Sequence, residues 1–237
     1  VSGRGELHLS ILIENLRREG FEFQVSRPRV ILKEIDGVIN EPYEYVQVDV
    51  PDEYIGSAIE MFGNRRGNLE GMNSKDGQTR LIYTIPSKGL IGFMTDFLTA
   101  THGYGIINHT FLEYRPVQPD VFMGRKLGVL VSINQGMATT YACGGVEDRG
   151  ELLIEPGIMV YEGMIVGICN REEDLAVNIT REKQMTNQRS ATKDSTTVLK
   201  KPRVFSLENY LSFIDEDELV EVTPNSIRLR KMILDTV

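Results

Sequence analysis

The sequence contains no tryptophan, two cysteines and three histidines among its 237 residues. Two cysteines, Cys143 and Cys169, are too few for a disulfide framework, and we favour two reduced thiols over a disulfide between them. The histidines His8, His102 and His109 lack the close pairing with a cysteine or a second histidine that a tetrahedral zinc site needs. The sequence therefore predicts no metal site. Each histidine is expected to pack, with contact to RNA or protein as the alternative.

Long apolar runs are also missing. No stretch reaches the roughly 18 residues that span a bilayer, so we expect no membrane partner. No secretory signal is visible at the start. The chain opens at Val1 rather than at a methionine, almost inside a predicted helix. We therefore expect a cytoplasmic protein, and we expect this chain to be the C-terminal part of a longer one whose chemistry lies in the preceding part.

The motifs of nucleotide hydrolysis are absent as well. A phosphate loop needs Gly-x-x-x-x-Gly-Lys-Ser/Thr, whose backbone amides wrap the phosphates, and no such run occurs. Residues 73–76 (Asn-Ser-Lys-Asp) have the residue types of a guanine-reading motif in the wrong order, and they are typical of a hairpin turn. We therefore expect this chain to hold no catalytic residue and no cofactor.

The charge is acidic overall but segregated along the sequence. Lys and Arg total 26 against 34 Asp and Glu, and this net charge of −8 argues against a protein that coats nucleic acid with its whole surface. Residues 181–203 nevertheless hold seven cations and two acids, whereas residues 204–222 hold six acids and no cation. The seven cations are Arg181, Lys183, Arg189, Lys193, Lys200, Lys201 and Arg203.

This basic segment, residues 181–203, also carries hydroxyl and amide side chains between its cations. Such a mixture suits RNA phosphates and 2′-hydroxyls better than base edges, and we predict a mobile RNA-binding loop. An ordinary solvated surface loop is the alternative. Arg228, Arg230 and Lys231 form a second and weaker basic group.

Hydrophobic periodicity predicts an α+β protein. Residues 5–18 have apolar side chains at helical spacing, and residues 21–25 and 30–35 are expected to be extended. Residues 43–114 follow the order β-α-β-β-α-β. This is the ferredoxin-like plan, in which right-handed crossovers put both helices on one face of a four-stranded sheet.

Beyond about residue 117 the glycines become frequent and the predicted strands short. The turn signals predict a short helix capped by Ser206, two final strands, and earlier strands at residues 126–133, 137–143, 151–154, 159–161 and 164–170. This pattern favours a β-barrel-like C-terminal domain with short helices, either a small barrel or a curled sheet.

Several motifs resemble elongation-factor-G-like translational GTPases. Residues 3–9 (Gly-Arg-Gly-Glu-Leu-His-Leu), before a helix, are similar to the third domain of those factors. Residues 51–56 (Pro-Asp-Glu-Tyr-Ile-Gly), 65–67 (Arg-Arg-Gly) and 87–92 (Ser-Lys-Gly-Leu-Ile-Gly) resemble their ferredoxin-like fifth domain. The fourth domain, which would lie between the two, has no room here.

Two further motifs are similar to the extra C-terminal domain of the BipA/TypA family, which lacks the fourth domain. They are residues 147–152 (Glu-Asp-Arg-Gly-Glu-Leu) and 155–164 (Glu-Pro-Gly-Ile-Met-Val-Tyr-Glu-Gly-Met). The resemblance covers essentially the whole chain. It implies the end of a domain-III-like α+β domain at residues 1–37, a ferredoxin-like domain at 38–116 and a family-specific domain at 117–237.

The resemblance implies a ribosome-associated GTPase of translation and ribosome assembly under stress or cold. GTP and Mg²⁺ would be bound by a preceding domain. This chain would dock, as a monomer, on 23S rRNA, A-site tRNA and ribosomal proteins near the GTPase-associated centre. The resemblance also adds Arg65, Arg66 and Lys88 to the candidate RNA contacts. For the two arginines, solvated charge at the end of a helix is the alternative.

Two other classes of function stay open. Ferredoxin-like domains commonly bind small ligands at dimer interfaces, so a metabolite-sensing regulatory module is the alternative, and a dimer stabilised by amino acids would favour it. A purely structural interaction domain is the third possibility, and a lack of salt-dependent RNA binding would favour that.

Overall fold

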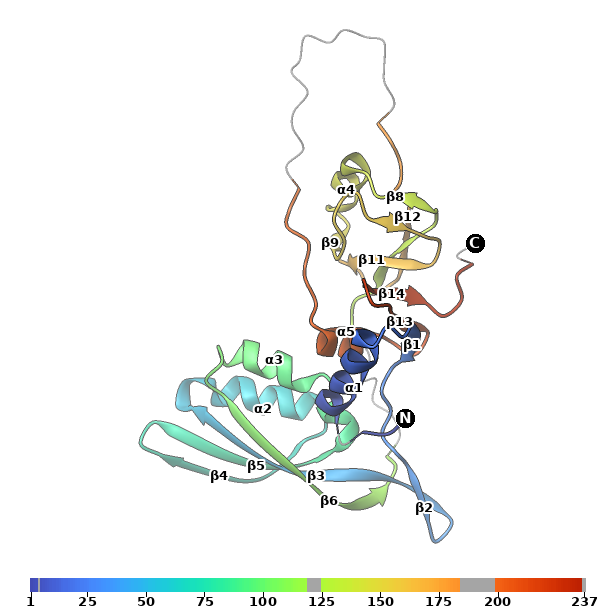
Figure 1. Ribbon diagram of the computed structural model, residues 1–237. Helices are drawn as coiled ribbons and strands as arrows, with labels where there is room; N and C mark the ends of the chain where they lie inside the picture. Colours follow the sequence, from blue (N-terminus) through green and yellow to red (C-terminus); the bar gives the residue numbers. More distant parts are fainter. Residues whose placement is uncertain (4, 119–124, 184–198, 236–237) are drawn as a thin grey trace. The chain divides into compact units, whose positions relative to one another are not determined.

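The computed structural model describes residues 1–3, 5–118, 125–183 and 199–235. The chain divides into two compact units (Figure 1). Unit 1 comprises Val1–Arg27 and Gly124–Val237, and unit 2 comprises Pro28–Met123. Each unit has its own buried core and is described by itself.

Unit 2 is built on one antiparallel sheet. Its strands are β2 (Lys33–Ile35), β3 (Val38–Pro51), β4 (Asn68–Lys75), β5 (Gln78–Pro86) and β6 (Ile106–Pro116). The long strand β3 pairs with β5 on one side and with β6 on the other, and β4 pairs with β5. The sequence of neighbours β6-β3-β5-β4 is therefore the order of a ferredoxin-like sheet, and β2 extends it as a hairpin with the start of β3.

The helical segments of unit 2 lie on one face of this sheet (Figure 1). They are η1 (Asp52–Tyr54) with α2 (Ile55–Asn64), and η2 (Ser87–Leu90) with α3 (Phe93–Ala100). Alternate residues of β3 and β5, among them Val46, Val48 and Tyr83, point to the helices and are almost fully buried. Phe62 of α2 stacks on Tyr83 with ring centroids 4.3 Å apart. The predicted β-α-β-β-α-β order is confirmed.

Unit 1 is built on a larger sheet with the strand order β1-β13-β14-β11-β7-β12, and β9 pairs with β11. A separate two-stranded ribbon joins β8 to β10. The strands are β1 (Phe23–Ser26), β7 (Val129–Ser132), β8 (Gly136–Met137), β9 (Gly150–Leu152), β10 (Met159–Val160), β11 (Met164–Cys169), β12 (Leu175–Val177), β13 (Glu218–Val222) and β14 (Ile227–Lys231). The helices are α1 (Glu6–Arg18), α4 (Thr140–Val146) and α5 (Leu207–Phe213).

The central strands of unit 1 are buried on both faces. Val129 and Val131 of β7 belong to the core that includes α1 and α5, whereas Leu130 belongs to the core that includes α4. Successive side chains of a strand point to opposite faces of the sheet. A strand that is covered on both faces therefore needs apolar residues at nearly every position, as β7 and β11 have.

Two sequence expectations for this region need correction. The strand expected at residues 137–143 is wrong: β8 ends at Met137, and Thr140–Val146 is helix α4. The helix forms because Thr139 caps it and because Ala142, Cys143 and Val146 lie on one buried side. The described strands also do not close into a barrel, since β12 and β1 end the sheet without pairing to each other. Helices cover its faces instead.

The first 27 residues share a compact unit with the C-terminal segment. Strand β1 pairs with β13 from Phe23 opposite Val222 to Ser26 opposite Leu219, and Ile13 of α1 is buried in the core that includes α5. A helix and a strand alone bury too little apolar surface to be stable, and here they obtain it from the C-terminal sheet. The origin of residues 1–37 in a domain-III-like domain stays a prediction.

Candidate nucleic-acid interface

The described start of the basic segment is fixed to the N-terminal end of α4. Thr139 is the N-cap of this helix, and its Oγ1 accepts a hydrogen bond from the amide of Ala142 at 3.1 Å. The same hydroxyl donates to the carbonyl oxygen of Arg181 at 2.5 Å. The amide of Thr139 also donates to the carbonyl of Ile179 at 3.0 Å. The residue that starts the helix therefore also fixes the point at which the basic segment begins.

The described end of the basic segment is fixed to the C-terminal end of α4 and to β9. The amide of Lys200 donates to Oε1 of Glu147, the residue that follows α4, at 2.7 Å. The amide of Arg203 donates to the carbonyl of Leu152 at 2.9 Å, and its Nη1 lies 3.4 Å from Oε2 of Glu151. Figure 1 shows α4 between the two flanks of the grey stretch. The two flanks of the segment therefore meet opposite ends of one short helix.

Exposed cations stand on both flanks. Arg181, Lys200 and Lys201 are exposed, and in the described part of the chain no hydrogen bond or ion pair involves their side-chain nitrogens. Lys183 is exposed as well. Arg189 and Lys193, with the rest of residues 184–198, lie outside the described residues, so the predicted mobility of the loop stays a prediction. The flanks present positive charge to solvent, where a polyanion can replace the water.

Lys231 of the second basic group lies in a network of acids. Its ammonium group is 2.5 Å from Asp174, 2.8 Å from Asp217 and 3.1 Å from Glu218, and only 13% of its side chain is exposed. Burial disfavours its charge, but the bonds to Asp174 and Asp217 prevail and raise the pKa of Lys231. Glu218 is fully buried and also pairs with Arg125 at 2.8 Å. This geometry favours a structural role for Lys231 over RNA contact.

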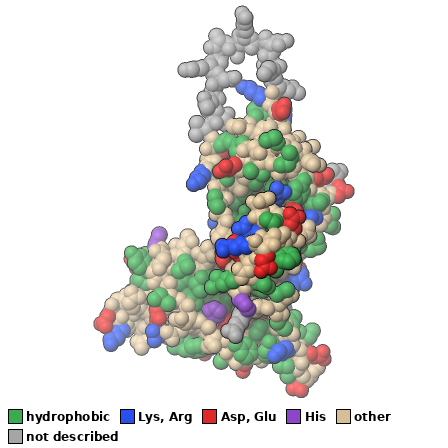
Figure 2. Space-filling view, in the orientation of Figure 1, with side chains coloured by type: hydrophobic (Ala, Val, Ile, Leu, Met, Phe, Trp, Pro, Cys, Tyr) green, Lys and Arg blue, Asp and Glu red, His purple; other side chains and the backbone are tan. Residues whose placement is uncertain are grey.

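Arg228 and Arg230 lie on the same strand, β14, and are half-buried. Arg228 is directly opposite Glu221 on β13, where opposite charges attract. Arg230 donates from Nε to the carbonyl of Lys231 at 3.1 Å and from Nη2 to that of Met232 at 3.4 Å. Figure 2 shows the same mixture, with Lys and Arg side chains close to Asp and Glu side chains over much of the face in view.

The candidate RNA contacts of unit 2 lie close together, and the side chains of Arg65 and Lys88 bond to other groups of the same unit. Arg65 donates from Nη1 to the carbonyls of Ile91 at 2.8 Å and Gly89 at 3.2 Å. Lys88 pairs at 3.0 Å with Glu41, whose side chain is 1% exposed. Arg66, two residues after the last residue of α2, has a left-handed backbone, φ 62°. Arg65 and Lys88 thus hold α2 and η2 in place, which the motif alone did not reveal.

Two arginines that the sequence analysis did not select line the same hollow in unit 1. Gly150 of β9 is opposite Cys169 of β11, so Arg149 falls opposite Asn170, and Arg171 follows Asn170 in the chain; Arg149 and Arg171 both line the hollow at this end of the strand pair. The amide of Asn170 donates to the carbonyl of Arg149 at 2.9 Å. Antiparallel pairing of the strands predicted at residues 151–154 and 164–170 would have brought the two arginines to the same end of the pair. The sequence does not specify the register of that pairing, so it did not identify them.

The described ranges contain few features of membrane-spanning, metal-binding or thiol-dependent proteins. No helix there is long and apolar enough to cross a bilayer, and no group of three His, Cys, Asp or Glu is placed to hold a metal ion. Cys143 and Cys169 are free and buried, and burial raises the pKa of the Cys143 thiol, with Glu147 adding to the effect.

Comparisons with known proteins cover both units. Residues 127–236 match the family described as the TypA/BipA C-terminal domain, and residues 38–124 match the elongation factor G C-terminus. Three relatives carry the name "Large ribosomal subunit assembly factor BipA". The chain is 60% identical over 236 residues to that of Bacillus subtilis, over 99% of this chain and 39% of the relative.

The other two relatives are more distant. Identity is 52% to the protein of Synechocystis, over 98% of this chain and 39% of the relative. It is also 52% to the protein of Escherichia coli K12, over 98% of this chain and 38% of the relative. The chain thus spans about two fifths of the length of the curated relatives it matches. Since the similarity runs through almost every residue and both domain models match in order, the chain belongs to the TypA/BipA family.

Proposed function

We propose that this chain is the ribosome-docking region of a BipA-type large-subunit assembly factor and that its basic segment contacts RNA. The observation that carries the proposal is the attachment of the segment at both ends of α4, with Arg181, Lys200 and Lys201 exposed on its flanks. The family membership and the printed name of the relatives support the ribosome as the partner.

The physical basis is local charge on an acidic protein. A net charge of −8 repels RNA from most of the surface, so binding is confined to the place where cations outnumber acids. Phosphates and 2′-hydroxyls are the groups that lysine, arginine, hydroxyl and amide side chains contact without reading sequence. Together with the family resemblance, this chemistry leads us to propose 23S rRNA and the acceptor arm of A-site tRNA as the partners.

The ferredoxin-like unit has a different part in this proposal. Because Arg65 and Lys88 are bonded within the unit, we assign them to holding α2 and η2 rather than to phosphate contact. Arg66 is half-buried, and the resemblance keeps it a proposed contact, next to ribosomal proteins near the GTPase-associated centre. GTP and Mg²⁺ would be bound by a domain outside this chain, in a cytoplasmic, monomeric factor of stress or cold adaptation.

Salt-dependent binding to large ribosomal subunits tests the proposal. Replacing Arg181, Lys200 and Lys201 by Gln removes three potential phosphate contacts without touching the backbone bonds that anchor the segment. If each contact releases about 0.7 counterion, the slope of log K against log salt becomes shallower by about 2. A control variant with Gln at the exposed residues Arg18, Lys75 and Arg80 carries the same change in net charge. Equal slopes for the two variants would rule out the basic segment as the RNA contact.

A further inference from the structure

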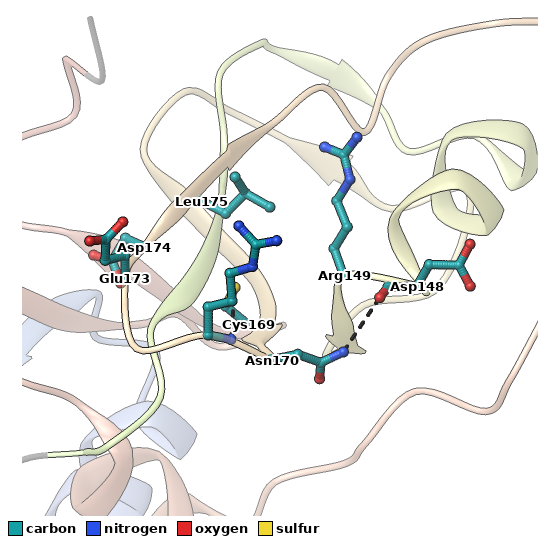
Figure 3. A pocket seen from close by; sticks show the side chains of 8 residues that line it. Asp148, Arg149, Cys169, Asn170, Glu173, Asp174 and Leu175 are labelled. Atoms are coloured by element: carbon teal, nitrogen blue, oxygen red, sulfur yellow. Dashed lines mark hydrogen bonds between the residues drawn. The ribbon is translucent and has the colours of Figure 1, made fainter.

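A hollow of about 370 Å³ opens at the end of strands β9 and β11. Arg149 and Arg171 contribute its cationic side chains, and Cys169 and Leu175 contribute apolar surface. Figure 3 shows Arg149 extended along one wall, with Leu175 across from it and Cys169 and Asn170 below. The hollow lies entirely in unit 1 and consists only of described residues.

The two arginines differ from most others in the described part of the chain. Arg80 pairs with Asp49 at 2.7 Å and Arg125 with Glu218 at 2.8 Å, as is usual for arginines in this acidic protein. The guanidinium groups of Arg149 and Arg171 have no hydrogen bond or ion pair with any residue that the structure describes. Ten N–H donors, five on each arginine, therefore face solvent at the rim of one hollow.

The acids that line the hollow do not neutralise these groups. The carboxylate of Asp174 is bonded to Lys231 and accepts the amide of Val129 at 2.8 Å, and these bonds, against the effect of burial, keep its pKa below its usual range. Figure 3 shows the Asp148 carboxylate turned away from Arg149, and Glu173 at the far side. The rim next to Arg149 is thus cationic and the floor apolar.

We propose that this hollow binds a phosphate group carried by a ligand the size of a single nucleotide. Two guanidinium forks clamp phosphate oxygens bidentately. Leu175 and the Cys169 side chain offer an apolar floor to a ribose or base, and the Asn170 side-chain oxygen offers an acceptor. The phosphate comes either from an RNA strand or from a free nucleotide. The site lies outside the basic segment, so it goes beyond the proposed function.

Binding to the complete 237-residue chain tests this site with three probes: inorganic phosphate, AMP and a short single-stranded RNA. Amide NMR signals of Gly150, Asn170 and Arg171 report occupancy of the hollow itself. We expect at least one probe to shift these signals. Changing both arginines, Arg149→Gln and Arg171→Gln, should weaken that binding by about tenfold or more, since each removes charge-assisted hydrogen bonds.

Two further variants keep the test decisive. Arg171→Lys keeps the charge but loses the fork, and it should bind between the wild-type chain and the double variant. Arg18→Gln with Lys75→Gln has the same charge change as the double variant at exposed sites elsewhere, and its affinity should equal that of the wild-type chain. The site is refuted if no probe shifts the three amides, or if the double variant and this control bind equally well.

The probes also separate the two sources of phosphate. Shifts with AMP that depend on the two arginines identify a free nucleotide as the ligand. Shifts with RNA alone identify a strand phosphate, and either result supports the site. Binding of the double variant to ribosomes is measured in parallel. Because the basic segment is unchanged in that variant, loss of the hollow leaves the proposed function standing, and failure of the basic-segment test leaves the hollow standing.

Discussion

The hydroxyl of Thr139 donates to the carbonyl oxygen of Arg181 at 2.5 Å while it caps α4. A single side chain therefore both starts a helix and anchors the basic segment. Thr139→Val keeps the shape but removes the hydroxyl. We expect the free energy of unfolding in urea to fall by about 1–2 kcal/mol. Ribosome affinity should fall too, because the start of the segment loses its anchor.

A second N-cap provides the matched control for Thr139. Ser206 caps α5 by accepting the amide of Asn209 at 3.3 Å, and no bond connects its side chain to the described part of the basic segment. Ser206→Ala should reduce stability by a similar amount and leave ribosome affinity unchanged. If both variants lost affinity equally, general destabilisation would explain the loss, and the anchoring role of Thr139 would be refuted.

Lys231 tests whether a basic residue of β14 is structural. Lys231→Met removes the cation from Asp174, Asp217 and Glu218 and leaves these carboxylates with less compensation. We expect unfolding to become easier by about 3 kcal/mol, as when one partner of a buried ion pair is removed. The salt dependence of ribosome binding should keep its slope. A shallower slope at unchanged stability would assign Lys231 to RNA contact instead.

The pair of Lys88 and Glu41 allows a double-mutant cycle. Glu41 is buried, with Lys88 3.0 Å away and the amide of Gln118 donating to its other oxygen at 3.3 Å. Lys88→Met alone leaves a buried carboxylate, so we expect a coupling energy with Glu41→Gln of about 2 kcal/mol. Urea unfolding of the four proteins measures it. Additive effects would show that the pair contributes nothing and would return Lys88 to the candidate RNA contacts.

His109 of β6 should make the stability of unit 2 depend on pH. The bond to Glu44 raises the pKa of His109 above its ordinary value, against the effect of burial, and lowers that of Glu44. A raised histidine pKa stabilises the fold below the unfolded value of about 6.5, and this contribution is lost as pH rises through the folded pKa. The side chain is 43% exposed, so solvent screening limits the effect to less than about 1 kcal/mol.

His109→Gln can still donate to Glu44 but cannot titrate, and it isolates this effect. The difference in unfolding free energy between the wild-type chain and the variant should shrink as pH rises from about 6.5, the unfolded value, through the raised pKa of His109. His8 and His102 are present in both proteins and cancel. A difference that stays constant over this range would contradict the assigned pair. Glu44 acts in the opposite range, because its lowered pKa gives stability that is lost only in acid.

Much of unit 2 could be predicted because its signals are local. The alternation of Val46, Val48 and Val50 marks a half-buried strand, and the apolar spacing of α2 and α3 gives their buried sides. Helix α4 had no such signal. Its seven residues include Gly144 and Gly145, which favour other conformations, and it is helical because Thr139 caps it and the tertiary structure buries one of its sides.

The candidate site was predictable in composition but not in pairing. A count of charges identifies the basic segment, but it cannot show that Lys88 has Glu41 as a neighbour 47 residues away, or that Lys231 has Asp174. The converse holds for Arg149 and Arg171. They are unremarkable in sequence, and the pairing of β9 with β11, which puts Arg149 opposite Asn170, brings both to the same hollow. Long-range pairing decides which cations are available, and composition does not contain it.

The pairing of β1 with β13 determines how a truncated protein that lacks the first residues would behave. Residues 23–26 cover one side of β13, so a protein trimmed to start near residue 124 would present the bare amides and carbonyls of β13 along a strand that contains Val220 and Val222. An open edge of this kind recruits strands from other molecules. Such a trimmed protein should precipitate or form oligomers, and adding back a peptide of residues 6–27 should restore a monodisperse solution.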